Sequence, residues 1–157
     1  MQQTAYINSP IGIIKIVGDN NGVSIIKLET EGTPSIQIAP DLQTAATQLQ
    51  EYFHQKRTHF TFKLNPAGTP FQQKVWFELL AIPFGKTISY LTLAKKLGDA
   101  KVIRAAATAN GKNPLFIVVP CHRVIGSNGA LTGFSAGLWC KKWLLEHETP
   151  SKQQQLF

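Results

Sequence analysis

Hydrophobic positions in the first third of the chain follow a strand pattern and then a helix pattern. Residues 12–17 and 23–28 are two runs rich in β-branched residues on either side of an Asn21-Gly22 dipeptide, which is typical of a β-hairpin. From Asp41 to Phe53 apolar residues recur every three or four positions, which predicts an amphipathic helix with Asp41 as its N-cap. The segment 31–40 is rich in turn residues and has room for one short strand at 35–38, and a strand is expected at 60–64, where polar and apolar residues alternate.

The pattern after residue 68 is mainly helical. Thr69 begins a capping box with Pro at the first helical position, so a helix is predicted to start there. Ser89 and Asp99 are predicted caps of two further short helices, separated by Gly98. This pair resembles a helix-turn-helix, although many helical proteins contain such pairs.

The remaining pattern completes an α+β fold. The apolar run 115–119 predicts a buried strand, and residues 137–148 predict a last helix. The turn-rich segment 65–68 is the best boundary. We therefore expect an N-terminal domain of sheet and helix (residues 1–66), a mainly helical C-terminal domain with the helix-turn-helix and Cys121 (residues 67–149), and a flexible tail (residues 150–157).

Composition adds a charge argument and several exclusions. The 157 residues include 16 Lys and Arg against 9 Asp and Glu, so the net charge of +7 favours a polyanionic partner such as nucleic acid, although many basic proteins bind none. The sequence contains neither an apolar run of membrane-spanning length nor a readable signal peptide, so no membrane association and a cytoplasmic location are expected. Two cysteines are too few for a disulfide framework or a structural zinc site, and we predict no metal and no cofactor.

The segment Pro120-Cys121-His122-Arg123 is the strongest candidate for chemistry. A cysteine held behind a rigid proline, with cationic neighbours that favour the thiolate, is how a reactive nucleophile is built. A cysteine beside a predicted core strand also serves simply to fill space. These four residues alone leave both interpretations open.

A longer series of motifs resembles the O6-alkylguanine-DNA alkyltransferases, the suicide repair methyltransferases. It spans about residues 69–148 in order and is highly specific. Its parts are Phe71-Gln72-Gln73-Lys74-Val75-Trp76, Ile82-Pro83-Phe84-Gly85-Lys86-Thr87-Ile88-Ser89-Tyr90, Arg104-Ala105-Ala106, Asn113-Pro114, Val119-Pro120-Cys121-His122-Arg123-Val124-Ile125 and Trp143-Leu144-Leu145-Glu146-His147-Glu148.

The resemblance implies a role for five catalytic residues. Cys121 would take the alkyl group from O6 of guanine, His122 would accept the thiol proton through a water, and Glu148 would orient His122. Asn113 would tie the cysteine-bearing turn to the helix-turn-helix. Tyr90 would donate a hydrogen bond to N3 of the leaving guanine.

The resemblance also implies a substrate pocket. The backbone of Ser135 would meet O6, and the carbonyls of Cys121 and Val124 would accept from the exocyclic amine. Phe134 belongs to the pocket but stands where the family usually has Tyr. Ala136 replaces a usual Gly of the same loop.

DNA contacts are implied for the second helix of the helix-turn-helix. Arg104 would enter the base stack in place of a flipped guanine, and the small residues Ala105 and Ala106 would let the helix approach the minor groove. Arg123 is a further expected DNA contact. Ala107 stands where the family usually has Gly.

The function implied by the resemblance is direct-reversal repair of double-stranded DNA, acting once per molecule on O6-alkylguanine and also on O4-alkylthymine. We expect a monomer. The tail Gln153–Phe157 resembles peptides that bind the replication sliding clamp, although it is equally compatible with an unstructured end. The competing functions are a non-catalytic module that binds lesions, which the presence of Cys121 disfavours, and a Cys-His hydrolase, for which no oxyanion hole is evident.

Overall fold

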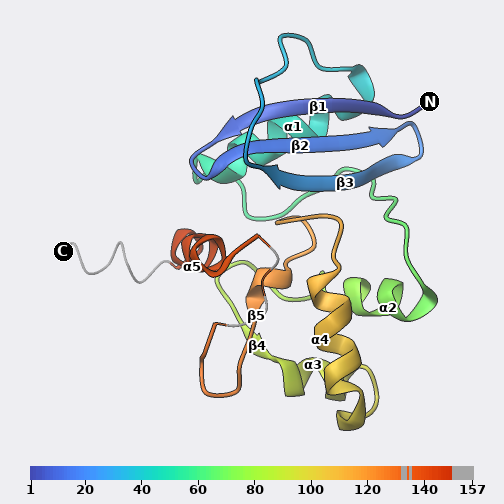
Figure 1. Cartoon of the computed structure of the whole chain (residues 1–157), viewed down its shortest axis with the longest axis vertical. Coiled ribbons are helices and arrows are strands. Elements are labelled where there is room, and N and C mark those ends of the chain that lie inside the picture. Colours follow the sequence, from blue (N-terminus) through green and yellow to red (C-terminus); the bar gives the residue numbers. More distant parts are fainter. Residues whose placement is uncertain (132–133, 135, 150–157) are drawn as a thin grey trace, which may run out of the picture. The chain divides into compact units, whose positions relative to one another are not determined.

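The chain forms two compact units, which the computed structural model describes over residues 1–131, 134 and 136–149 (Figure 1). The first unit is Met1–Ala67 together with Pro114–Val118, and the second is Gly68–Asn113 together with Val119–Phe157. A sheet with a helix in the first unit and mainly helices in the second confirm the α+β class. The return of residues 114–118 to the first unit is a feature that the sequence analysis did not include.

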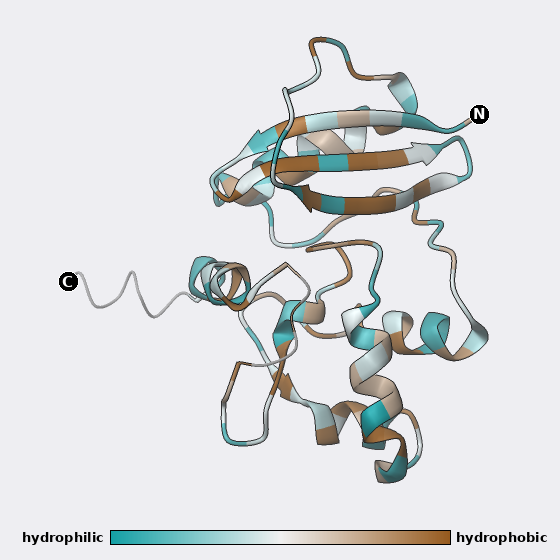
Figure 2. Cartoon of the chain, in the orientation of Figure 1, coloured by the Kyte–Doolittle hydropathy of each residue, from teal (hydrophilic) through white to brown (hydrophobic). Residues whose placement is uncertain are grey.

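The first unit is a three-stranded antiparallel sheet covered on one face by a helix (Figure 1). Its elements are β1 (Gln3–Ser9), β2 (Gly12–Asp19), β3 (Gly22–Glu29) and α1 (Pro40–Phe53). The predicted hairpin is β2 and β3, and β1 pairs with β2 on the other side. Hydrophobic residues run along β2 and β3 (Figure 2). Fully buried side chains of the unit come from both layers, among them Ala5, Ile14, Ile16, Ile26, Leu42 and Leu49.

Two predicted short strands of the first unit are absent, so these expectations were wrong. Residues 35–38 and 60–64 form no strand. Ser35 contacts β1 at one position only, where its N–H donates to the carbonyl of Tyr6 and its hydroxyl accepts from the N–H of Tyr6. Leu64 forms a single bridge with Val23 of β3. Alternating side chains are insufficient here because a strand needs several successive ladder bonds.

The start of α1 also differs from the prediction. The helix begins at Pro40 with Ala39 as its N-cap, and no side chain caps it. Asp41 lies in the first turn, where its negative charge interacts favourably with the helix dipole. Pro40 starts the helix because its missing N–H and fixed φ suit the first helical position.

The apolar run 115–119 is not a buried strand, so this expectation was also wrong. Leu115 forms a single parallel bridge with β3. The N–H of Val118 then donates to the carbonyl of Phe116 at 2.8 Å, which closes a three-residue turn around Ile117 at φ 72°. A β-branched residue rarely adopts a positive φ, so the hydrophobic sequence does not reveal this turn.

The second unit carries the helix-turn-helix and Cys121. Its elements are α2 (Pro70–Leu79), β4 (Ile88–Ser89), α3 (Tyr90–Lys96), η1 (Ala100–Val102), α4 (Ile103–Gly111), η2 (Cys121–Arg123), β5 (Val124–Ile125) and α5 (Leu138–His147), where η denotes a 3₁₀ helix. The helix pair α3 and α4, joined through η1, confirms the predicted helix-turn-helix.

Local capping explains where these helices begin. The capping box of α2 is present, since the Thr69 hydroxyl accepts from the N–H of Gln72 at 3.1 Å and the Gln72 side chain accepts from the N–H of Thr69 at 3.0 Å. Ser89 caps α3, and Asp99 caps η1. The predicted starts at Thr69 and Ser89 are therefore confirmed, whereas Asp99 caps the 3₁₀ turn that precedes α4, and α4 itself begins at Ile103 without a side-chain cap.

A short parallel ladder positions the start of α3 beside the Cys121 segment. Ile88 of β4 pairs with Val124 of β5, and Ser89 pairs with Ile125. Tyr90 follows β4 directly, and Cys121 lies three residues before β5. Two segments that are distant in sequence therefore meet at one place in the second unit. No helix in the described part of the chain is long and apolar enough to cross a membrane.

Candidate active site

The backbone around Cys121 forms a tight turn centred on Pro120. Pro120 has φ −82° and ψ 64°, and the N–H of Cys121 donates to the carbonyl of Val119 at 2.8 Å, which is an inverse γ-turn. The side-chain amide of Asn113 donates to the same carbonyl at 2.7 Å. The position of Cys121 is therefore defined by a rigid proline and by a side chain that follows α4.

The Cys121 thiol lies in the interior, with 6% of the residue exposed. Burial raises the pKa of the thiol, while a hydrogen bond from Asn113 and the positive charge of Lys141 lower it by less. We expected cationic neighbours to favour the thiolate, but desolvation outweighs them in this structure. The resting cysteine is thus a thiol, and its reaction requires a base.

His122 is a buried imidazole with one nitrogen bonded and one available. Its Nε2 lies 2.8 Å from Oε2 of Glu148, and among the described residues its Nδ1 has no hydrogen-bond partner. Burial lowers the pKa of His122, and the contact with Glu148 only partly opposes this shift. A neutral imidazole that donates from Nε2 to a carboxylate keeps the lone pair of Nδ1 free to accept a proton.

The Glu148 carboxylate accepts hydrogen bonds from two side chains, those of His122 and Arg123. Nε and Nη2 of Arg123 lie 2.8 and 3.0 Å from its two oxygens, in a bidentate pair beside the His122 contact. Burial alone would raise the pKa of Glu148, but the hydrogen bonds from His122 and Arg123 outweigh it and hold the pKa well below the usual range. The carboxylate therefore stays ionised and orients the imidazole.

The structure corrects the expected DNA contact at Arg123. The residue is 5% exposed, and its third nitrogen, Nη1, donates to the carbonyl of Ile82 at 2.7 Å. Because the guanidinium is buried and donates its hydrogen bonds to Glu148 and Ile82 inside the unit, it is not available to bind a DNA phosphate. No local feature of the sequence signals this role, since the partners are 25 and 41 residues away.

Lys141 is a functional candidate that matches the last helix of the family but to which the resemblance assigned no role. It is fully buried on α5, and its Nζ donates to the carbonyl of Val124 at 2.7 Å and to the hydroxyl of Tyr90 at 3.4 Å. The ammonium also lies 5.6 and 5.9 Å from the ring centres of Tyr90 and Phe134. The signal in the sequence is a lysine beside Cys140 on the apolar side of the last helix.

The structure brings most of the predicted pocket residues together. Tyr90, Val124 and Phe134 all lie around the Lys141 ammonium, whose charge also acts on Cys121. Ser135 lies outside the described residues. This part of the second unit therefore gathers a buried thiol, a buried cation and two aromatic rings, groups that suit a flat heteroaromatic ring with polar edges.

The predicted DNA-contact residues of α4 divide between its two faces. Arg104 and Ala105 are exposed, whereas Ala106 is 0% exposed and faces the core of the unit. A contact between the Ala106 side chain and DNA is therefore excluded by burial, which corrects that expectation. Exposed lysines continue the basic surface of the helix-turn-helix, at Lys95, Lys96 and Lys101.

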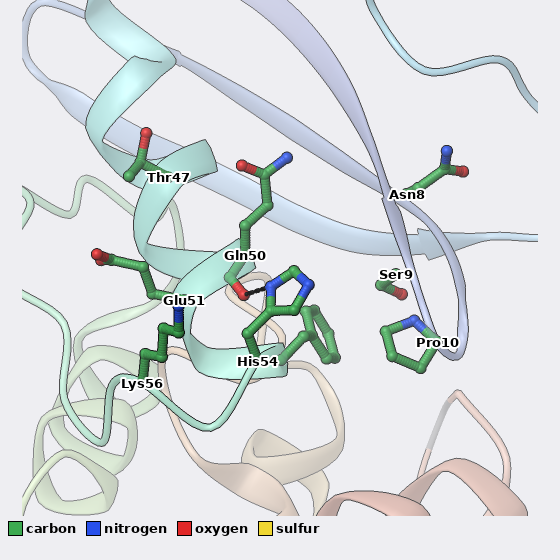
Figure 3. Close-up of a pocket in the computed structure, with 9 residues that line it drawn as sticks. Asn8, Ser9, Pro10, Thr47, Gln50, Glu51, His54 and Lys56 are labelled. Carbon is green, nitrogen blue, oxygen red and sulfur yellow. Dashed lines mark hydrogen bonds between the residues drawn. The ribbon is translucent and has the colours of Figure 1, made fainter.

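A separate hollow lies entirely in the first unit, whereas Cys121 belongs to the second. Its volume is about 770 Å³, and it lies between the turn after β1 and the end of α1 (Figure 3). Nδ1 of His54 bonds the carbonyl of Gln50 at 2.7 Å, and Glu51 pairs with Arg57 outside the hollow. The polar side chains His54 and Glu51 thus make local contacts within the first unit. The candidate nucleophile, Cys121, lies in the second unit, which we therefore take as the unit that carries the active site. Nowhere in the described residues do three His, Cys, Asp or Glu side chains gather as a metal site would require.

Comparisons with known proteins agree with this site. The sequence-family model for the 6-O-methylguanine DNA methyltransferase, DNA binding domain, matches residues 70–150. The family model for the ribonuclease-like domain of 6-O-methylguanine DNA methyltransferase matches residues 3–66. The methylated-DNA–protein-cysteine methyltransferase of Methanosarcina acetivorans is 42% identical over 152 residues, which are 92% of this chain and 96% of the relative. That of Mycobacterium tuberculosis is 43% identical over 147 residues, 90% of this chain and 89% of the relative.

Solved structures give the same result over the whole chain. The crystal structure of Mycobacterium tuberculosis O6-methylguanine methyltransferase covers 100% of both chains with a TM-score of 0.84 at 37% identity. The structure of Mycobacterium tuberculosis OGT in complex with DNA covers 97% of this chain and 98% of that chain, with a TM-score of 0.81 at 39% identity. The chain therefore belongs to the 6-O-methylguanine DNA methyltransferase family.

Proposed function

We propose that this protein repairs O6-alkylguanine in DNA by transferring the alkyl group irreversibly to Sγ of Cys121. The observation that carries the proposal is the buried set in which Cys121 follows a γ-turn and His122, held by Glu148, keeps Nδ1 free to accept a proton. Family membership supplies the substrate class, and the relative in complex with DNA supports DNA as the partner.

The reaction is an in-line displacement at the alkyl carbon. The thiol proton passes through a water to Nδ1 of His122, and Sγ of Cys121 forms a bond to the alkyl carbon as the carbon–O6 bond breaks. The electron pair of that bond stays on guanine, where a hydrogen bond from Tyr90 to N3 stabilises the developing charge. Glu148 stabilises the imidazolium. Because no group regenerates the thiol from the thioether, each molecule reacts once.

The base pocket is proposed to recognise guanine through backbone groups. The carbonyls of Cys121 and Val124 accept from the exocyclic amine, beside the side-chain donors Asn110 and Lys141 and, at Cys121, the backbone N–H of Val124. The backbone of Ser135 meets O6, and the ring of Phe134 provides an apolar wall. The same pocket is proposed to accept O4-alkylthymine, which presents an equivalent alkoxy carbon.

Access to the alkyl carbon requires the base to leave the stack. Flipping costs a few kcal/mol and is easiest where the lesion weakens base pairing. The exposed Arg104 is proposed to fill the space in the stack, and Ala105 is proposed to contact the groove. The exposed lysines around them are proposed to bind phosphates, so the affinity falls with salt.

The decisive test is the intact mass of the protein after incubation with a duplex that contains one O6-methylguanine. We expect the wild-type protein to gain one methyl group, the Cys121→Ala variant to gain none, and the Cys140→Ala variant to react like the wild type. Binding to the lesion without any gain in mass would refute transfer and would favour a non-catalytic lesion-binding module. A gain in mass that persists in Cys121→Ala would refute Cys121 as the acceptor.

The finer partner assignments are proposals as well. We propose that the protein acts as a monomer in the cytoplasm and that Gln153–Phe157, outside the described residues, binds the replication sliding clamp by folding on contact. Light scattering tests the first assignment. A pull-down of the clamp with and without residues 153–157 tests the last, and equal recovery would refute it.

A further inference from the structure

Asn110 is a buried polar residue at the end of α4 that has no role in the mechanism above. It is 1% exposed, and its side-chain amide Nδ2 donates to the carbonyl of Cys121 at 3.4 Å. Its Oδ1 is buried and has no hydrogen-bond partner among the described residues. A buried amide with one long hydrogen bond and one unsatisfied oxygen lowers stability, because the hydrogen bonds that it makes to water in the unfolded chain are not fully replaced in the folded protein.

The contact of Asn110 complements that of Asn113. Asn113 binds the carbonyl of Val119, at the start of the γ-turn, and Asn110 binds the carbonyl of Cys121, at its end. Two side chains from the end of one helix and the following segment therefore hold both carbonyls that flank Pro120. Because the peptide groups before Pro120 and after Cys121 are both held, the backbone defines the direction in which Cys121 projects its Cβ and Sγ.

We propose that Asn110 is a positioning residue for alkyl transfer, which aligns the peptide group of Cys121 from α4. The inference rests on the proposed function, since it assumes that Cys121 accepts the alkyl group. The Cys121 carbonyl accepts from Nδ2 of Asn110 and from the backbone N–H of Val124, so the two donors together fix the orientation of this peptide group. Asn110 thus sets the direction of the nucleophile from α4, and its unsatisfied oxygen is the cost of that contact.

The test compares rate, affinity and stability in Asn110→Leu, which removes both polar atoms and keeps the number and branching of the side-chain heavy atoms. We expect its methyl-transfer rate at saturating lesion duplex to fall by roughly tenfold or more, since small misplacements of reacting groups cost about that much. Its melting temperature should stay equal or rise. Asn110→Asp keeps the shape but replaces the donor with an acceptor, so it should react more slowly than Asn110→Leu.

Trp76→Phe provides the matched control. Trp76 Nε1 donates to the carbonyl of Ala109, a buried bond to the neighbouring residue of the same helix that does not reach Cys121. This variant should lose thermal stability and keep its transfer rate at a temperature where it is folded. A structural role for Asn110 would instead give parallel losses of rate and stability in both variants.

Two outcomes would overturn the inference while the proposed function stands. One is a wild-type rate in Asn110→Leu. The other is a loss of rate that is matched by weaker binding of the lesion duplex, measured in a Cys121→Ala background, because Asn110 would then act on DNA docking. If the wild-type protein gains no methyl group in the same assay, the proposed function fails and the inference fails with it.

Discussion

Replacing Glu148 with Gln tests whether its ion pair with Arg123 is truly desolvated. Glu148 accepts hydrogen bonds from His122 and Arg123 at 2.8 to 3.0 Å, and the side chains of all three residues are at most 7% exposed. Gln keeps the shape but leaves the buried guanidinium without a counter-charge. Removal of one partner from a buried pair costs about 3–5 kcal/mol, whereas a surface pair contributes about 0–1 kcal/mol. For a chain of this size, the loss of about 3–5 kcal/mol expected for a buried pair lowers the melting temperature by roughly 6–20 °C.

The assay is urea unfolding of single and double variants. Glu148→Gln and Arg123→Met should each lose about 3–5 kcal/mol, and the double variant should lose at least about 2 kcal/mol less than their sum, because it leaves no unpaired charge. Glu146→Gln is the control on the same helix, since its 3.9 Å contact with Lys142 is exposed and should contribute only about 0.3–0.5 kcal/mol. If Glu148→Gln costs no more than Glu146→Gln, or if the two single losses simply add, water reaches this pair and the reasoning is refuted.

Three further predictions concern pH, substrate contact and helix capping. The folded pKa values of His122 and Glu148 both lie below their unfolded values, so their stabilising effect is present above the unfolded pKa values and is lost as pH falls. The free energy of unfolding should therefore decrease from about pH 7 downward. An equal decrease in a His122→Phe/Glu148→Gln variant would contradict this. Tyr90→Phe should slow methyl transfer by roughly tenfold or more without weakening lesion binding, as a single-turnover time course would show, and an unchanged rate would remove the Tyr90 hydroxyl from the mechanism. Thr69→Ala should cost about 1 kcal/mol of unfolding free energy in a urea titration, and no loss would mean that the capping box of α2 contributes nothing.

Local features of the sequence determined much of the fold. The hairpin of β2 and β3, the capping box at Thr69 and the caps at Ser89 and Asp99 depend on residues within a few positions of each other, and each occurs where it was predicted. The family resemblance covered about residues 69–148, which include the caps but not the hairpin, and it drew attention to Cys121. The pattern of apolar residues alone failed at residues 35–38 and 60–64 and at the continuous apolar run 115–119, because a strand also needs a neighbour along its length.

Only the tertiary structure decided how the side chains of the site are used. Arg123 follows His122 in sequence and was expected at the DNA, but its partners Ile82 and Glu148 hold it inside the unit. Lys141 and Asn110 acquired roles because their polar atoms meet backbone carbonyls 17 and 11 residues away. Burial reversed the expected direction of the shift in the Cys121 pKa. Helix caps and turns follow from neighbouring residues, whereas desolvation and buried ion pairs depend on contacts from every segment that surrounds a side chain, and those contacts exist only once the chain has folded.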